Sequence, residues 1–287
     1  MTVLEIVQAS TEYFRKRQVE SARLNAEHLL AYVLGRKRID LYLEFDRGLT
    51  EAELAPLREL VRRRGEGEPL QHLLGTVEFC GQVFSCDKRA MVPRPETEEL
   101  VELIVGECCN RTRDGGEPAA NLTILDVGTG SGVIALSLAI KLPQARIVGV
   151  DISQQALGLA RENADQLGLA ERVEFRHRDL LDDLCERFDI IVANLPYIAM
   201  SDRSSLSREV RHDPDTALFG GEHGHEVIQR MIELAPGRLL AGGLLALEIG
   251  ETQTGAVMDA FAQKKYKDIE LKNDYSGRPR FVFARYG

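Results

Sequence analysis

The segment that most constrains this chain is residues 123–151, where two apolar runs flank a glycine-rich turn and a stretch with helical spacing. The first run holds Asp126, and the second ends at Asp151. The turn between them reads Gly128, Thr129, Gly130, Ser131, Gly132. This order predicts a strand, a tight turn, a helix and a second strand. Because glycine allows sharp turns and a close approach of the backbone to a ligand, we expect a nucleotide-like molecule to bind here.

Details of the turn discriminate between candidate nucleotides. A dinucleotide fingerprint needs its third glycine at the position of Val133, whereas here that glycine falls one place early, at Gly132. The helix start has no Lys or Arg that could bind a phosphate, so a Walker-type site is not indicated. Asp151 can accept both ribose hydroxyls of a nucleoside. The turn resembles the first motif of class I S-adenosylmethionine methyltransferases, which favours a methyl donor, with NAD as the alternative.

Three consecutive predicted strands end in polar side chains. Asp151 ends the second strand, residues 173–178 are followed by Asp179, and residues 188–193 are followed by Asn194. In an open parallel sheet, ligands bind at the edge formed by the carboxyl ends of the strands. We therefore expect these three side chains to lie along one ligand-binding edge.

A four-residue segment after the last of these strands is where we expect the chemistry, and it reads Asn194, Leu195, Pro196, Tyr197. A sulfonium donor is already activated, so the enzyme must mainly align the nucleophile. If that nucleophile is a planar amide or aryl amine, the Asn194 side-chain oxygen and the Leu195 carbonyl can accept its two hydrogens and direct its lone pair. Pro196 keeps Leu195 extended, and Tyr197 offers a flat face for stacking. We predict all four to be catalytic and substrate-binding residues.

Composition limits the remaining possibilities. The chain has 287 residues, which favours two domains, and 44% of them are apolar. The net charge of −9 lies in residues 91–287, and a basic stripe for duplex binding is missing. No apolar run approaches the length of a membrane span. The five cysteines form no C-x-x-C pair, and His223 with His225 lies in a glycine-rich loop, so we expect reduced thiols and no metal. A cytoplasmic protein is predicted.

Helical spacing dominates the first 65 residues. Gly35 is expected to end one helix, and Thr50 with Glu53 forms a capping box for another. Residues 77–84 suggest a β-hairpin that bridges two domains. We therefore expect a helical docking domain at 1–70, a hairpin linker at 71–90 and a catalytic domain at 91–287.

The segment after the hairpin is rigid and charged. Pro93 and Pro95 keep the chain extended, and Thr97 is expected to begin a helix at residues 98–109. Arg94 and Glu96 in this segment are predicted to form one wall of the active site and to bind substrate.

The last third of the chain predicts alternating helices and strands. Helices are expected at 226–234 and 252–264, a buried strand at 243–249, and loops at 110–121 and 213–225. Residues 268–273 and 280–284 suggest a terminal hairpin that places an antiparallel strand at the edge of a seven-stranded sheet.

Motifs from about residue 65 to the end resemble the HemK/PrmC family, the release-factor glutamine methyltransferases. They are PLQHLLG, FCGQVF, VPRPETEELVE, ILDVGTGSGVIALSLA, NLPYI, LEIGETQ and NDYSGRPRF. The resemblance implies a Rossmann-like class I methyltransferase fold, with a mostly parallel sheet whose last strand is antiparallel, behind a helical N-terminal domain. It implies methylation of N5 of the glutamine in the Gly-Gly-Gln motif of peptide-chain release factors, with S-adenosyl-L-methionine as donor.

The resemblance also implies roles for individual residues. The turn 128–132 and Asp151 would hold the donor, together with Asp126 and Asn194. Asp179 and Leu180 would lie near its adenine, and residues 194–197 would bind the substrate amide. The family usually has proline where this chain has Leu195, but the backbone carbonyl that the mechanism needs is still present.

Two other functions share these motifs. An adenine-N6 or other nucleic-acid methyltransferase would flip a base into the same pocket, and the acidic charge argues against it. A non-catalytic donor-binding module is the second alternative, and the intact Asn194, Pro196 and Tyr197 argue against that. We expect a monomer that acts on a release factor, without direct contact to nucleic acid or membrane.

Overall fold

The computed structural model describes residues 1–110 and 121–287, which form two compact units. The smaller unit consists of Met1–Thr76 and Leu206–His212, and the larger of Val77–Ser205 and Asp213–Gly287. Apart from its two end residues, the loop predicted at 110–121 lies outside the described residues. Within the described part of the chain, every helix is too short or too polar to cross a lipid bilayer.

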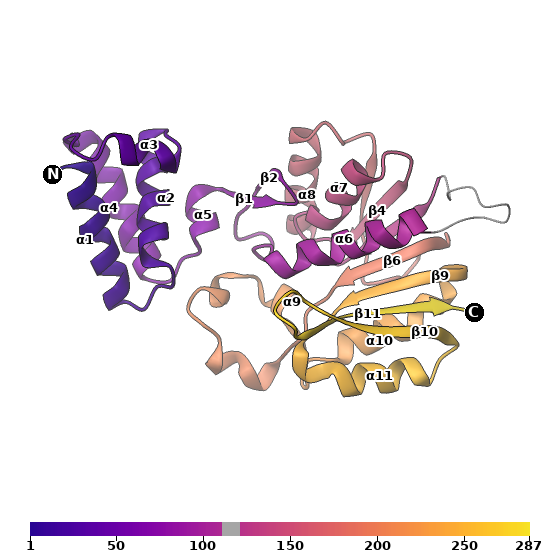
Figure 1. The fold of residues 1–287 in the computed structure, drawn as a ribbon. Helices are drawn as coiled ribbons and strands as arrows, with labels where there is room; N and C mark the ends of the chain where they lie inside the picture. The colour runs from indigo at the N-terminus through magenta and orange to yellow at the C-terminus, as the bar shows by residue number, and fades with distance from the viewer. Residues whose placement is uncertain (111–120) are drawn as a thin grey trace. The chain divides into compact units, whose positions relative to one another are not determined.

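The smaller unit is helical, as predicted (Figure 1). The predicted helix stop at Gly35 and the capping box of Thr50 with Glu53 are confirmed. Apolar side chains such as Phe14, Leu29 and Leu30 fill its core. The helices are α1 (Val3–Lys16), α2 (Ala22–Leu34), α3 (Arg38–Leu43), α4 (Glu51–Gly65) and α5 (Leu70–Leu74), with the 3-10 turn η2 (Val210–His212).

A buried arginine ties the distant segment Leu206–His212 into the smaller unit. The Arg64 guanidinium donates to the side-chain oxygen of Asn25 at 2.7 Å and to the backbone oxygen of Glu68 at 3.0 Å. A third nitrogen donates to the Glu209 carboxylate at 2.7 Å. Arg64 is 5% exposed, and a buried charge needs a partner of opposite sign. Glu209, which lies far along the sequence, is that partner.

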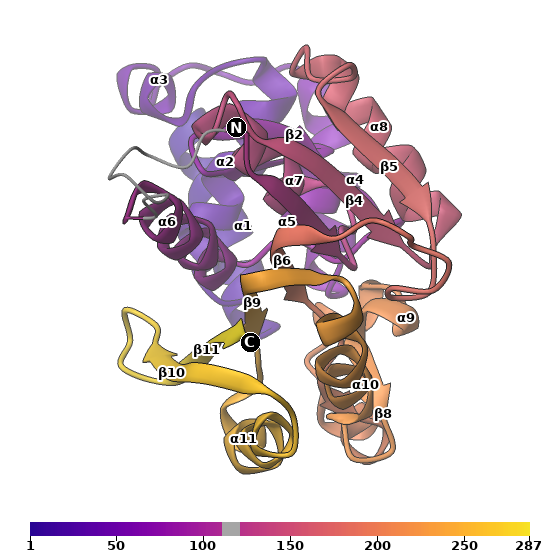
Figure 2. The ribbon, with the colours of Figure 1, turned by 90° about the vertical axis from the view of Figure 1, so that its right-hand side faces the viewer.

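The larger unit is organised around a seven-stranded sheet in the order β10-β11-β9-β6-β3-β4-β5. All neighbouring strands pair in parallel except β11, which pairs antiparallel with both β9 and β10. The predicted sheet with an antiparallel last strand is therefore confirmed (Figures 1 and 2). The strands are β3 (Thr123–Val127), β4 (Arg146–Asp151), β5 (Val173–His177), β6 (Phe188–Asn194), β9 (Leu239–Glu248), β10 (Tyr266–Asn273) and β11 (Pro279–Tyr286).

Helices cover both faces of the sheet, and successive strand residues point into different cores. These helices are α6 (Pro95–Asn110), α7 (Val133–Lys141), α8 (Gln154–Gln166), α10 (Glu226–Leu234) and α11 (Thr254–Ala262). Ile124 packs in one core with residues of α6, α7 and α8, and Leu125 packs in the other core with residues of α10 and α11. Short 3-10 turns are η1 (Met200–Ser205), η3 (Ala235–Gly237) and η4 (Glu251–Gln253).

The predicted hairpin is present as β1 (Thr76–Phe79) and β2 (Gln82–Ser85). Its turn is Cys80 and Gly81, one residue earlier than expected, and both have positive φ, at 49° and 74°. Two positive φ angles match the twist of a two-residue hairpin. Phe79 and Phe84 are buried in the core beside α6 and α7, so the hairpin is packed onto the larger unit.

The sequence predicts an antiparallel strand at the sheet edge. In the structure, β11 is the second strand of the sheet and not the edge strand, because β10 pairs on its outer side. The two strands differ in polarity. Residues 281–284 of β11 are apolar and buried, whereas β10 carries exposed charged side chains at Lys267, Asp268 and Glu270. Charged side chains protect an edge strand from pairing with other chains, which explains why β10 is outermost.

Two local predictions need correction. Helix α6 begins at Pro95 and not after Thr97, because proline is well tolerated in the first helical turn, where its missing N–H has no intrahelical partner. Residues 213–225 are not simply a loop. They contain the short helix α9 (Asp215–Leu218) and β8 (Phe219–Gly221), which pairs in parallel with β7 (Ile198–Ala199).

The hairpin packing makes a stability prediction. Phe84 is fully buried and meets Phe79 edge to face at a centroid distance of 6.2 Å. Phe84→Ala is expected to lower the free energy of unfolding by about 3–5 kcal/mol in urea denaturation of the full chain. The neighbouring Val83 is 51% exposed, so Val83→Ala should cost about 0.5 kcal/mol or less. Equal losses for the two variants would contradict the packing described.

Candidate functional site

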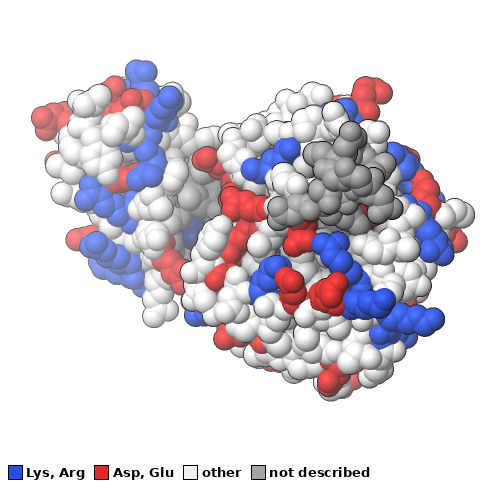
Figure 3. Space-filling model, turned by 45° about the vertical axis from the view of Figure 1, so that its right-hand side comes forward, with Lys and Arg blue, Asp and Glu red and all other residues white. Residues whose placement is uncertain are grey.

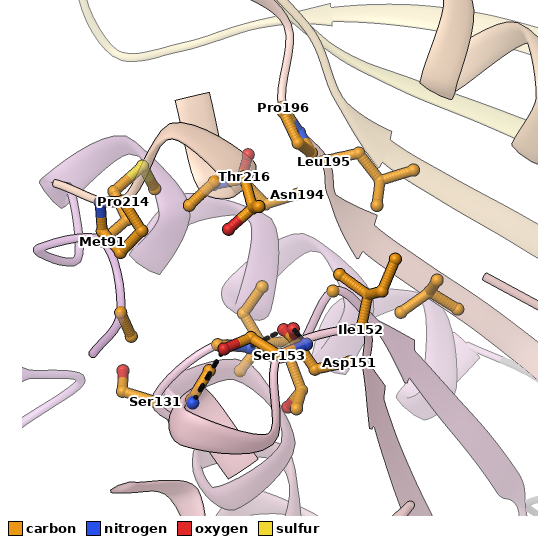
Figure 4. A pocket seen from close by; sticks show the side chains of 18 of the residues that line it. Met91, Ser131, Asp151, Ile152, Ser153, Asn194, Leu195, Pro196, Pro214 and Thr216 are labelled. Atoms are coloured by element: carbon orange, nitrogen blue, oxygen red, sulfur yellow. Dashed lines mark hydrogen bonds between the residues drawn. The ribbon is translucent and has the colours of Figure 1, made fainter. Parts of the chain in front are cut away.

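A cavity of about 330 Å³ lies at the carboxyl ends of the parallel strands, within the size range of small-molecule sites. Figure 4 shows its two sides. One side carries Ser131, Asp151 and Ser153, and the other carries Asn194 and Pro196. The position matches the point where the strand order reverses, because β4 and β5 lie on one flank of β3 and β6 and β9 on the other.

The glycine turn is shaped by backbone hydrogen bonds. The N–H groups of Gly128 and Thr129 donate to the Val150 carbonyl at 2.9 and 3.0 Å. Gly128, Gly130 and Gly132 all have positive φ, between 57° and 82°, which side chains disfavour. A Cβ on Gly132 would come within 3.1 Å of Ala160 on α8. Gly132 is absent from the cavity lining, so its position indicates a packing role, while residues 128–131 line the cavity.

Asp126 lies beneath this turn and not in the cavity. One carboxylate oxygen accepts the Thr129 hydroxyl at 2.6 Å and the Ala135 N–H at 3.2 Å. The side chain is fully buried, and this burial raises the pKa of Asp126 to about 7. Its contacts therefore join the turn to the start of α7, which differs from the donor contact expected from the sequence.

Asp151 does line the cavity, and each of its oxygens already accepts one backbone N–H. The donors are Gly130 and Ser153, both at 2.8 Å (Figure 4). Burial raises the pKa of Asp151 above its ordinary value. A carboxylate has about four acceptor positions, so capacity remains for two hydroxyl groups of a ligand.

An apolar wall extends from Asp151 along the cavity. Ile152, Leu180 and Val227 contribute to it, beside Asp179. Asp179 is paired with Arg230 at 2.8 Å, so its carboxylate is partly engaged outside the cavity. Leu180 has a φ of 49°, an uncommon backbone conformation for a leucine. These residues form a surface suited to a flat, largely apolar ring.

Asn194 ends β6, and its side chain is held by a hydrogen-bond chain. Its Nδ2 donates to Thr97 Oγ1 at 3.1 Å, and the Thr97 hydroxyl donates to Glu248 Oε2 at 2.8 Å. Among the described residues, the hydrogen bond of the Asn194 side chain is made by Nδ2 and not by Oδ1. Asn194 and Glu248 are register partners in the parallel pairing of β6 with β9. Thus the amide nitrogen is engaged, and the oxygen remains available.

The rest of the segment 194–197 is fixed from several sides. Leu195 and Pro196 line the cavity, whereas Tyr197 does not and packs against the core instead. The Tyr197 carbonyl accepts the Gln253 side-chain N–H at 2.6 Å. A Cβ on Gly220 would lie 2.3 Å from the Pro196 carbonyl, so only glycine fits there. The stacking role expected for the Tyr197 ring is therefore not supported by its position.

The segment that leads into α6 contributes Arg89, Met91 and Pro93 to the cavity lining, and the first turn of α6 contributes Thr97. Arg94 and Glu96 are not in the lining. The Arg94 guanidinium instead pairs with Asp213 at 3.0 Å, and the same carboxylate accepts the Val92 N–H at 3.1 Å. Arg94 thus fastens this segment to the loop before α9.

Sequence reasoning missed Thr97, Glu248 and Gln253 as parts of the site. The sequence predicts Thr97 as a helix cap, whereas its hydroxyl oxygen accepts a hydrogen bond from the Asn194 side chain. The sequence does indicate Glu248, because this acid lies within the apolar run LLALEIG. An acidic residue in a buried strand is rarely found without a partner, so its position points to a specific contact. Gln253 ends the motif LEIGETQ, which marks this segment but not its contact with the Tyr197 carbonyl.

Two protein families match the chain. The PrmC N-terminal domain family matches residues 5–75, and a family described as a methyltransferase domain matches residues 118–218. Two solved structures share the fold. The hMettl16 catalytic domain, in complex with an RNA hairpin, has a TM-score of 0.55 and 13% identity over 83% of this chain and 82% of its own. The Thermus thermophilus 16S rRNA methyltransferase RsmC, in complex with AdoMet and guanosine, has a TM-score of 0.50 and 20% identity over 74% of this chain and 50% of its own.

Full-length relatives are more similar. A release factor glutamine methyltransferase of Rhodopirellula baltica is 40% identical over 98% of this chain and 95% of its own length. One of Geobacter sulfurreducens is 39% identical over 100% of this chain and 97% of its own. The MTRF1L release factor glutamine methyltransferase of Homo sapiens is 35% identical over 99% and 87%, respectively. The family predicted from the motifs is confirmed: the chain belongs to the release factor glutamine methyltransferases.

Proposed function

We propose that this protein transfers a methyl group from S-adenosylmethionine to N5 of the glutamine in the Gly-Gly-Gln motif of peptide-chain release factors. The observation that carries the proposal is the state of Asn194. Its amide nitrogen is held by Thr97, and its oxygen remains an acceptor at the cavity. An amide substrate offers two N–H donors, which require acceptors and not further donors.

The cavity residues fit the donor. Asp151 retains acceptor capacity for ribose hydroxyls, and the turn 128–131 lets the backbone approach closely. Ile152, Leu180 and Val227 provide an apolar surface for adenine. When bound, S-adenosylmethionine supplies a methyl group on a positively charged sulfur, which is an activated electrophile.

The residues around Asn194 prepare the nucleophile. Its side-chain oxygen and the Leu195 carbonyl would accept the two glutamine N–H hydrogens and keep the nitrogen lone pair directed at the methyl group. The glutamine nitrogen gains the methyl group, the bond from sulfur to that carbon breaks with its electron pair staying on sulfur, and one N–H proton leaves to water. No side chain needs to act as a strong base, because nitrogen becomes acidic as it is alkylated.

The proposed partner is a release factor, and we propose no direct contact with nucleic acid. On the face drawn in Figure 3, the basic side chains of the larger unit lie beside acidic ones. The overall charge of −9 supports the same choice. We further propose that the protein acts as a monomer in the cytoplasm, where its partner works.

The first prediction concerns the acceptor. Mass spectrometry of the release-factor peptide should show a gain of one methyl group with the wild type and the donor. Asn194→Ala is expected to lower the rate by about 100- to 1,000-fold, because one preorganised hydrogen-bond partner is lost. The control Asn273→Ala removes an exposed asparagine at the end of β10 and should leave the rate unaltered. Label on a nucleic acid and none on the factor would refute the proposal.

The second prediction concerns the donor. Asp151→Asn keeps the shape of the side chain but replaces one acceptor oxygen with a donor group. We expect donor affinity, measured by isothermal titration calorimetry, to fall by roughly 10- to 100-fold, as for hydrogen bonds to a charged group. Asp182→Asn is the matched control, because Asp182 pairs with Arg230 on the surface and is not in the cavity lining. Comparable affinities for both variants would remove Asp151 from the donor site.

A further inference from the structure

The side chain of Asn194 can face the cavity with either end of its amide. The two ends have opposite hydrogen-bonding character, since Oδ1 accepts and Nδ2 donates. Only the orientation with Oδ1 free can accept the N–H hydrogens of an amide substrate. The site therefore needs a device that selects one of two orientations of nearly identical shape.

We propose that Glu248 is a positioning residue that acts through the Thr97 hydroxyl, and that its protonation state selects which end of the Asn194 amide faces the cavity. This inference rests on the function proposed above. Three elements bring the groups together: Asn194 ends β6, Glu248 ends the neighbouring β9 in register, and Thr97 lies in the first turn of α6. Thr97 is 3% exposed and Glu248 is 1% exposed, so water does not compete for these bonds.

The direction of the chain follows from the ionised carboxylate. A carboxylate only accepts, so the Thr97 hydroxyl must donate its single hydrogen to Glu248. The threonine oxygen then has only lone pairs left, and these accept the Nδ2 hydrogen of Asn194. Asn194 Oδ1 is consequently left for the substrate.

Protonation of Glu248 reverses the direction of the hydrogen bonds along this series of side chains. A neutral carboxyl group can donate its hydrogen to the Thr97 oxygen, which frees the threonine hydrogen to donate to Asn194 Oδ1. The amide would then turn over and present its NH₂ group to the cavity. Because the substrate amide also presents N–H hydrogens, two donors would face each other, and binding in the reactive orientation would be lost.

The surroundings of Glu248 set where this change occurs. Hydrogen bonding from Thr97 and from Asn194 itself favours the ionised form, as does the charge of Arg280 on β11. Glu96 on α6 opposes ionisation, and the Tyr197 ring lies nearby after β6. Burial has the largest influence and raises the pKa of Glu248 to about 7. The protonated form therefore dominates below about pH 7, and the ionised form that orients Asn194 dominates above it.

The first experiment removes the hydroxyl group in the middle of the hydrogen-bond chain that joins Asn194, Thr97 and Glu248. Thr97→Val keeps the shape of the side chain but has no hydroxyl, so kcat for methylation of the release factor at pH 8 should fall by up to about 100-fold through misorientation of the amide. Affinity for S-adenosylmethionine should stay within about twofold. Thr97→Ser restores the hydroxyl and should recover most of the loss. Equal kcat for the valine and serine variants would overturn the proposal.

The second experiment follows protonation. Wild-type kcat/KM for the release factor should decline about tenfold per pH unit below about pH 7. In Glu248→Gln this limb should vanish, because glutamine does not titrate in this pH range. Glu251→Gln, a change at an exposed neighbouring acid, should keep the limb. Persistence of the limb in Glu248→Gln would overturn the proposal.

A measurement without the release factor separates the two proposals. Difference infrared spectra of wild type against Glu248→Gln should show a protonated carboxyl band at pH 6 that disappears by pH 8. A band that is absent at pH 6 would refute the switch, whatever the substrate is. Failure of wild type to methylate the factor at pH 8, with the band behaving as expected, would instead refute the proposed function.

Discussion

Parallel pairing of β6 between β3 and β9 is the constraint on which the site depends. It brings the glycine turn after β3, Asn194 at the end of β6 and Glu248 at the end of β9 to one edge of the sheet. Beyond the carboxyl ends of the strands the backbone is no longer part of the ladder, so its polar groups bind side chains or a ligand. The cavity and the Asn194 side chain that lines it are thus placed by the same ladder of hydrogen bonds.

Charged groups at this edge are organised by how deeply they are buried. Asp126 lies beneath the turn and receives bonds from Thr129 and Ala135, whereas Asp151 lines the cavity with acceptor capacity to spare. Glu248 is also deeply buried, and the raised pKa means that its ionised form opposes folding. A buried acid that makes folding less favourable at neutral pH agrees with the positioning role that we propose for Glu248.

The sequence predicted the larger unit well, because its signals are local. Gly128 and Gly130 predict a tight turn, since its conformation depends only on neighbours in the chain. What the sequence could not predict depends on contacts between distant segments. The positions of Arg94 and of the Tyr197 ring are set by Asp213 and by the core, respectively, and neither partner is adjacent in sequence. For the same reason, the order of β10 and β11 could not be read from their hairpin alone.

The Arg64 cluster limits how this chain can be divided. A fragment ending at residue 76 would contain all the helices α1 to α5 but would lack Glu209, which lies in a segment that returns to the smaller unit. Arg64 would then keep its bonds to Asn25 and Glu68 while its buried charge lost its carboxylate, a change that typically costs about 3–5 kcal/mol. The N-terminal part is therefore a domain in space but not an independent piece of sequence, and grafting it onto another enzyme would require its later segment as well.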